Sequence, residues 1–185
     1  MEIKNQWLNK IFPALRPPGN GVYTVHTGQD KKINLLKKLY GSKNQAVVEK
    51  KWQESLLKND FSLKPLLLAI PSDSGAGIIK GSNWGPLFIR ESLDQKNMKK
   101  YFDLGDILCI PQLLMDDYLN ESTIANCQKA VYGKKNKLPV SCLSIADTLL
   151  GELYKHNPKA RVIGLGGDHS VSYPFVKNWI KNQKD

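Results

Sequence analysis

Residues 160–175 read Ala-Arg-Val-Ile-Gly-Leu-Gly-Gly-Asp-His-Ser-Val-Ser-Tyr-Pro-Phe, and this stretch decides the fold. A short run of apolar and β-branched residues bounded by Pro158 and by a glycine pair is typical of a buried parallel strand, which we expect over 161–165. Gly166 and Gly167 permit a positive φ or a close backbone approach, so a tight turn follows the strand. The sequence therefore predicts that His169 lies on the loop at the carboxyl end of this strand.

Apolar residues resume at helical spacing after this loop, which predicts a helix that tolerates Pro174 in its first turn. Other strands are expected near 66–70 and 106–110, and helices near 86–94, 121–131 and 144–156. The last of these helices begins with a Ser144-Ile-Ala-Asp147 capping pattern. Strands and helices that alternate in this way form right-handed crossovers. We therefore predict an α/β protein with a three-layer α/β/α architecture and a mainly parallel sheet, which binds ligands at the carboxyl edge of its strands.

The first third of the chain differs from the rest, and we predict two parts: a helical, lysine-rich N-terminal extension over 1–64 and the α/β domain over 65–185. Two amphipathic helices are expected in the extension. Their apolar faces are formed by Ile33, Leu36 and Leu39 in the first helix and by Val47, Val48, Trp52 and Leu56 in the second. A long insert over 111–139, with a helix capped near Asn120, separates the second and third expected strands.

Three ordered motifs carry a resemblance to a known family. The first is Ile70-Pro-Ser-Asp-Ser-Gly-Ala-Gly77 followed by Gly85-Pro-Leu-Phe-Ile-Arg-Glu91, the second is Phe102-Asp-Leu-Gly-Asp-Ile107, and the third is Leu165-Gly-Gly-Asp-His-Ser-Val-Ser-Tyr-Pro174. Together they resemble the first strand and helix, the second strand and the first metal signature of the manganese ureohydrolases, the family of arginase, agmatinase and formimidoylglutamase. The resemblance spans roughly residues 66–181, and three matches in order are far more specific than one short motif.

The resemblance implies that His169 ligates one ion of a binuclear manganese centre in a hydrolase that cleaves the C–N bond of a linear guanidine or amidine. Asp168 is expected to orient the loop, and the family pattern assigns neither it nor Asp73, Asp103 and Asp106 as ligands. The later family signatures, Asp-Ala-His-x-Asp and Ser-x-Asp-x-Asp, do not occur in these 185 residues. One imidazole cannot assemble a two-metal site. We therefore expect an amino-terminal portion with no complete catalytic site, weak or absent manganese binding and no activity alone.

An incomplete sheet also has consequences for partners. The strand over 161–165 would have an empty neighbouring position, and a hydrophobic parallel edge is an aggregation hazard unless another chain covers it. We expect a homo-oligomer or a complementing C-terminal chain, and a small guanidine or amidine as the substrate of the complete enzyme. The extension and the insert slightly favour a formimidoylglutamase-like or arginase-like member over an agmatinase.

Other interpretations remain at this point. The chain could be a non-catalytic remnant or a partner-binding module of the same fold. A net charge of +10 and a pI near 9.4 raise the possibility of a nucleic-acid-binding domain. The basic residues, however, are nearly all lysines scattered on helix faces, which is typical of a solvated surface. Nucleotide binding at Gly75–Ser82 is a weak alternative, because the glycine spacing fits neither phosphate-binding pattern.

Compartment and the remaining histidines give weaker indications. Cys109, Cys127 and Cys142 show no zinc spacing and no Cys-x-x-Cys pair, so we expect reduced thiols and a cytoplasmic protein. The longest apolar run has five residues, which excludes a predicted membrane span. His156 is expected to close a helix, and His26 lies in an undistinguished stretch.

Overall fold

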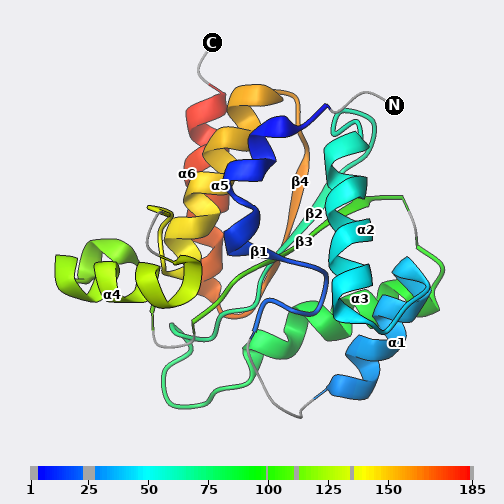
Figure 1. Cartoon of the computed structure of the whole chain (residues 1–185), viewed down its shortest axis with the longest axis horizontal. Coiled ribbons are helices and arrows are strands. Elements are labelled where there is room, and N and C mark those ends of the chain that lie inside the picture. Colours follow the sequence, from blue (N-terminus) through cyan, green and yellow to red (C-terminus); the bar gives the residue numbers. More distant parts are fainter. Residues whose placement is uncertain (1–3, 23–27, 99, 111–112, 134–135, 184–185) are drawn as a thin grey trace.

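The chain folds around a sheet whose two faces are covered by helices (Figure 1). The computed structural model describes residues 4–22, 28–98, 100–110, 113–133 and 136–183. The strands within these residues are β1 (Leu15–Arg16), β2 (Leu66–Ile70), β3 (Phe102–Ile107) and β4 (Val162–Gly166). The helices are α1 (Gln29–Tyr40), α2 (Gln45–Lys58), α3 (Gly85–Gln95), α4 (Glu121–Tyr132), α5 (Cys142–His156) and α6 (Ser172–Asn182). Short 3-10 turns over Gln6–Lys10, Phe12–Ala14, Ser82–Trp84, Asp116–Tyr118 and His169–Val171 link them.

The sheet has the strand order β1-β3-β2-β4. β2 pairs in parallel with both β3 and β4, which confirms the predicted parallel sheet, whereas β1 pairs antiparallel with β3. β1 was not predicted, because it has only two residues and pairs with a strand that is distant in sequence. At this contact Gly105 has a φ of 96°, and a Cβ on it would lie 2.3 Å from the carbonyl oxygen of Arg16. The close approach of β1 to β3 therefore needs glycine at this position.

The predicted elements are largely confirmed, with two differences in position. The strand expected at 106–110 instead covers Phe102–Ile107, because its two carboxylates are buried against an arginine and do not interrupt the strand. The helix expected from Ser144 begins two residues earlier, at Cys142. The predicted Ser144 cap is therefore wrong. The amide nitrogen of Asp116 donates to the Ser144 hydroxyl over 3.0 Å, so that hydroxyl joins the insert to α5 instead.

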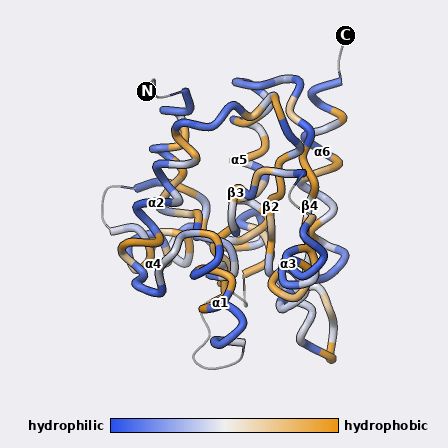
Figure 2. Tube along the Cα trace, turned by 90° about the vertical axis from the view of Figure 1, so that its right-hand side faces the viewer, coloured by the Kyte–Doolittle hydropathy of each residue, from blue (hydrophilic) through white to orange (hydrophobic). Residues whose placement is uncertain are grey.

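β2 contributes to two hydrophobic clusters, one on each face of the sheet. Leu66, Leu68 and Ile70 face a large cluster with α5, whereas Leu67 and Ala69 face the side of α3. Figure 2 shows the apolar strand β2 running through the middle of the molecule, with helices around it. Successive side chains of a strand point to opposite faces of the sheet, so β2 contributes to the core on both faces. All of its residues are buried for this reason.

The N-terminal part packs into that same core. Leu8, Leu15, Trp52 and Leu56 are all buried in the cluster that α5 and β2 form. The two predicted amphipathic helices are present as α1 and α2, although Leu39 and Val47 of the expected apolar faces are exposed and Leu35 is buried instead. The division of the chain into an extension over 1–64 and an α/β domain over 65–185 stays a prediction.

Candidate active-site edge

The carboxyl edge of the sheet is formed by the loops that leave β2 and β4. Gly167 N donates to the carbonyl oxygen of Ile70 over 3.2 Å, and Asp168 N donates to that of Ser72 over 3.0 Å. A Cβ at Gly167 would lie 1.7 Å from the Ser72 oxygen, so no other residue fits without backbone movement. The predicted close approach of the glycine pair is thus present, and neither glycine needs a positive φ.

Asp168 joins the two loops through its side chain. One carboxylate oxygen accepts from the amide of Ser170 over 2.8 Å, which caps the short turn beginning at His169. The other accepts from the amide of Gly75 over 2.9 Å, across 93 positions of sequence. A Cβ on Gly75 would lie 3.0 Å from the Asp168 carboxylate, so the glycine also provides the necessary space. Both oxygens are therefore engaged with main-chain amides, a geometry that orients the loop.

His169 lies immediately beyond this brace, three residues after the end of β4. Its side chain is exposed, and it makes no hydrogen bond with the part of the chain that the structure describes. Both imidazole nitrogens are therefore open to solvent or to a ligand, at the edge where parallel sheets bind small molecules. The structure confirms the predicted position of His169 just beyond the carboxyl end of a strand.

The loop after β2 is held by its own carboxylate. Asp73 is 6% exposed, and its Oδ2 accepts from the amide of Gly81 over 2.9 Å. Lys80 Nζ donates to the Asp73 carbonyl oxygen over 2.7 Å. Since the lysine amino group is engaged with the loop's own carbonyl, these contacts stabilise a rim and offer no phosphate cradle.

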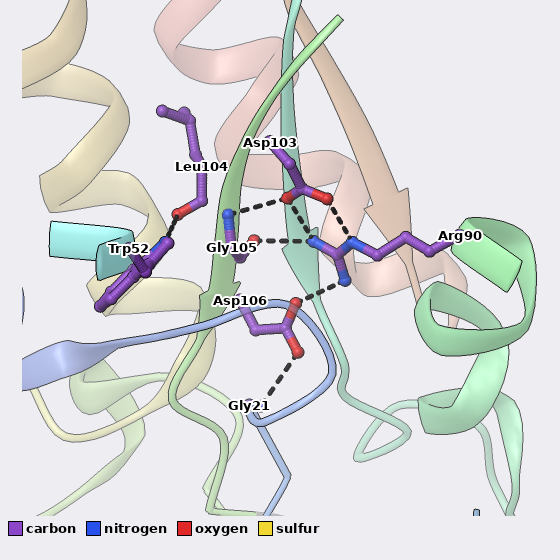
Figure 3. Close-up of polar contacts among 7 residues, drawn as sticks. All are labelled: Gly21, Trp52, Arg90, Asp103, Leu104, Gly105 and Asp106. Atoms are coloured by element: carbon purple, nitrogen blue, oxygen red, sulfur yellow. Dashed lines mark hydrogen bonds and ion pairs between the residues drawn. The ribbon is translucent and has the colours of Figure 1, made fainter. Parts of the chain in front are cut away.

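Arg90 crosses from α3 to the sheet and binds both aspartates of β3 (Figure 3). Nε and Nη2 donate to the two oxygens of Asp103 over 2.7 and 2.9 Å, and Nη1 donates to Asp106 over 2.5 Å. Nη2 also donates to the Gly105 carbonyl oxygen over 3.0 Å. The second oxygen of Asp106 accepts from the amide of Gly21 over 2.9 Å. The guanidinium is 1% exposed and the Asp106 side chain 2%, so the ion pair between them is buried, whereas the Asp103 side chain is 12% exposed.

The protonation states follow from burial and from charge. Burial raises the pKa of Asp106, and this effect is opposed by Arg90 and by the hydrogen bond from Gly21. Burial alone would lower the pKa of Arg90, but the two carboxylates outweigh it and raise that pKa. The arginine therefore stays charged, and neither aspartate of β3 is available as a metal ligand.

A comparison with protein families now adds to this geometry. A family model described as Arginase family matches residues 64–185, about two thirds of the chain. The chain belongs to the Arginase family. No curated protein and no solved structure gives a match. The match starts beside β2 and includes Asp168 and His169, and membership in this family indicates a hydrolase.

Arginase-family proteins generally bind manganese, an ion that needs several ligands at one site. No group of three or more His, Cys, Asp or Glu side chains that could hold a metal ion occurs among the described residues. Asp168 is engaged with amides, and Asp73 and Asp106 are buried in contacts of their own. Manganese prefers several oxygen ligands. The described residues by themselves therefore do not fit a complete binuclear centre, and His169 is the one candidate ligand with an open side chain at this edge.

The other two histidines lie elsewhere. His156 is the last residue of α5, as predicted; its ring stacks on Trp7 at a centroid distance of 5.4 Å, and its Nε2 lies 3.6 Å from Glu152. His26 lies outside the described residues. No helix of the described chain is long and apolar enough to cross a membrane.

A pair of thiols beside this edge was not predicted. Cys109 follows β3 and Cys142 begins α5, and both are buried. A hydrogen bond from Cys109 lowers the pKa of Cys142, against the effect of burial, whereas burial raises the pKa of Cys109. The two residues are 33 positions apart with no Cys-x-x-Cys pattern, so the sequence carries no signal of their proximity.

Proposed function

We propose that this chain supplies the first metal-ligating segment of a manganese-dependent hydrolase that cleaves the C–N bond of a linear guanidine or amidine. In this proposal His169 holds one ion, and manganese supplies the activation of water when it is bound. The observation that carries the proposal is an exposed imidazole at the carboxyl end of β4, which makes no hydrogen bond with the described residues and lies within the segment that matches the Arginase family. The substrates that fit are of the arginine, agmatine or formimidoylglutamate type, with a slight preference for the first and last.

The chain's own residues contribute positioning. Asp168 fixes the turn on which His169 stands, and it does so through backbone amides that do not depend on a metal ion. Because the described residues hold no group of three or more possible metal ligands, we expect the chain alone to bind manganese weakly and to be inactive.

We further propose that a strand carrying the remaining ligands docks along β4. β4 pairs with β2 on one side, and no strand of the described chain lies on its other side. Ile163 of β4 is 46% exposed, and Trp179 and Ile180 on α6 are each 55% exposed. A parallel strand with open hydrogen-bonding groups and apolar neighbours favours strand addition. The occupant we propose is a complementing polypeptide of the same fold; pairing between two copies of this chain is the outcome that would contradict it.

The test begins with the DNA immediately downstream, which should encode Asp-Ala-His-x-Asp in the same or a shifted frame. The encoded segment is then produced together with this chain, and manganese per complex is measured by metal analysis. We expect two ions in the complex, none retained stoichiometrically by the chain alone, and release of urea or formamide from the matching substrate. Stoichiometric manganese in the isolated chain would contradict the proposal.

A matched pair of histidine variants isolates the role of His169. In the complex, His169→Ala should remove at least one of the two ions and abolish hydrolysis, whereas His156→Ala, at the end of α5 and away from β4, should leave metal content unchanged. Equal metal content in the two variants would refute the assignment of His169 as a ligand.

We also propose a reducing location such as the cytoplasm. Cys109, Cys127 and Cys142 are all unpaired thiols in the structure. Titration of denatured protein from its native source should find three reactive thiols, and a disulfide would contradict this location.

A further inference from the structure

A second concavity lies at the opposite end of the sheet from His169. It has a volume of about 410 Å³ and is bounded by α1, α2, α3 and the first residues of β3. Phe102 and Asp103, which begin β3, line it, so it opens at the amino edge of the parallel strands. Its volume falls within the range of roughly 300–1,000 Å³ that is usual for small-molecule sites. Arg90, Phe102 and Asp103 of its lining belong to motifs that resemble the family, but the sequence did not predict a cavity at this edge.

The walls of this amino-edge cavity are largely apolar. Leu39 at the end of α1 is 47% exposed and Met98 after α3 is 52% exposed, and both line the cavity. Tyr40, Tyr101 and Phe102 add aromatic surface. Apolar and aromatic side chains that stay exposed around a concavity mark a binding surface more often than isolated exposed residues do.

Two tyrosine hydroxyls in the cavity have no hydrogen-bond partner within the described chain: those of Tyr40 and Tyr101. Burial raises the pKa of both phenols, and the negative charge of Asp103 raises it further, so both remain neutral hydroxyls. A neutral phenol oxygen accepts a hydrogen bond from an ammonium group. The hydroxyls therefore offer unused acceptors beside apolar walls.

Close to the two hydroxyls, two carboxylates oppose one cation: Asp103 and Asp106 against Arg90 at Tyr40, and Asp103 and Asp94 against Arg90 at Tyr101. Arg90 is shared by two carboxylates, Asp103 in the cavity wall and Asp106 behind it. Further out, Lys38 is paired with Asp94 and Lys51 Nζ donates to the Tyr40 carbonyl oxygen over 2.8 Å, so the excess of negative charge is local to the two hydroxyls. In a partly desolvated site an excess negative charge favours a cation and disfavours an anion.

We propose that the amino-edge cavity binds a small organic monocation, a protonated primary amine on an apolar body. The ammonium group lies between the hydroxyls of Tyr40 and Tyr101 and near the carboxylate of Asp103, where the tyrosine rings also attract a cation. The apolar part packs on Leu39 and Met98. This site is separate from the edge that bears His169, so it does not rest on the proposed hydrolase function.

The probes are three molecules of similar shape and different charge: 2-phenylethylammonium, 2-phenylethanol and 3-phenylpropanoate. Their dissociation constants for the full chain are measured by calorimetry and by ligand-observed NMR. We expect the ammonium compound to bind roughly tenfold or more tightly than the alcohol, and the carboxylate to bind most weakly. Equal affinity for the ammonium compound and the alcohol, or no binding of the ammonium compound at millimolar concentration, would overturn the proposal.

Matched variants locate the site without disturbing the buried ion pairs. Leu39→Arg places a cation at the mouth and should weaken binding of the ammonium compound by roughly tenfold or more. Val47→Arg makes the same change at an exposed position of α2 that does not line the cavity and should leave affinity unchanged. Tyr40→Phe, which removes a single acceptor, should weaken binding by a factor of roughly three to ten. Equal losses in the two arginine variants would show a general charge effect and refute the site.

Discussion

Replacing Arg90 by leucine should destabilise the protein far more than an ordinary loss of an ion pair. The guanidinium is 1% exposed and donates to Asp103, to Asp106 and to the Gly105 carbonyl oxygen. Leucine would leave two carboxylates unpaired, one of which is 2% exposed. Removal of one partner from a buried ion pair costs about 3–5 kcal/mol, so we expect Arg90→Leu to lower the free energy of unfolding by that amount at neutral pH.

The deficit should depend on pH in a defined direction. Burial raises the pKa of Asp106, and Arg90 is the largest effect that opposes the rise. Without the arginine the folded-state pKa rises further above the unfolded value of about 4. A carboxyl group with a raised folded pKa is best tolerated below the unfolded value, and stability is lost as the pH rises through the folded value. The loss in Arg90→Leu should therefore be greater at pH 8 than at pH 5.

Urea denaturation followed by circular dichroism at these two pH values measures both effects. Lys177→Met is the matched control, because Lys177 pairs with Asp147 over 2.8 Å at the surface, where such a pair is worth about 0–1 kcal/mol. A loss below about 1 kcal/mol in Arg90→Leu, or a deficit that shrinks as the pH rises, would refute the view that Arg90 holds two ionised aspartates in the interior.

Three other changes test the remaining features. Gly167→Ala should cost about 2–3 kcal/mol in denaturation, because its Cβ would lie 1.7 Å from a carbonyl oxygen, whereas Gly151→Ala in α5 meets nothing closer than 3.4 Å and should be neutral or stabilising. Asp168→Ala removes the bonds between the two edge loops, so amide exchange at Gly75 should accelerate, with the exposed Asp117→Ala as a control that leaves it unchanged. Titration with duplex DNA over a range of salt concentrations should show no steep salt-dependent association; a steep slope would revive the nucleic-acid interpretation.

The elements that were predicted well are those whose signal is local. β2 has five consecutive apolar residues and was predicted with its observed bounds, and the glycine pair after β4 indicated a close backbone approach that the structure contains. His169 was placed at a sheet edge because a strand, a turn and a helix follow one another within a short window. Family membership was likewise readable from three short motifs.

The features that escaped prediction depend on partners distant in sequence. β3 was expected at 106–110 and begins four residues earlier, because Asp103 is compatible with a strand of the sheet only when Arg90 of α3 is placed against it. β1 exists only through its pairing with β3. The amino-edge cavity brings Tyr40 and Tyr101 together from positions 61 residues apart, and no spacing rule connects them. Local patterns define elements, whereas the contacts between elements decide which polar groups can be buried.

The brace at Asp168 determines how the candidate ligand is presented. Two backbone amides, one on each edge loop, hold its carboxylate, and a third contact runs from its own amide to Ser72. All of these groups belong to this chain and none requires a metal ion. The turn that carries His169 is therefore held at the sheet edge without an ion, and ion binding would not have to order it. In the proposed function, further ligands would have to supply charge and coordination number, because the main chain already sets the position of His169.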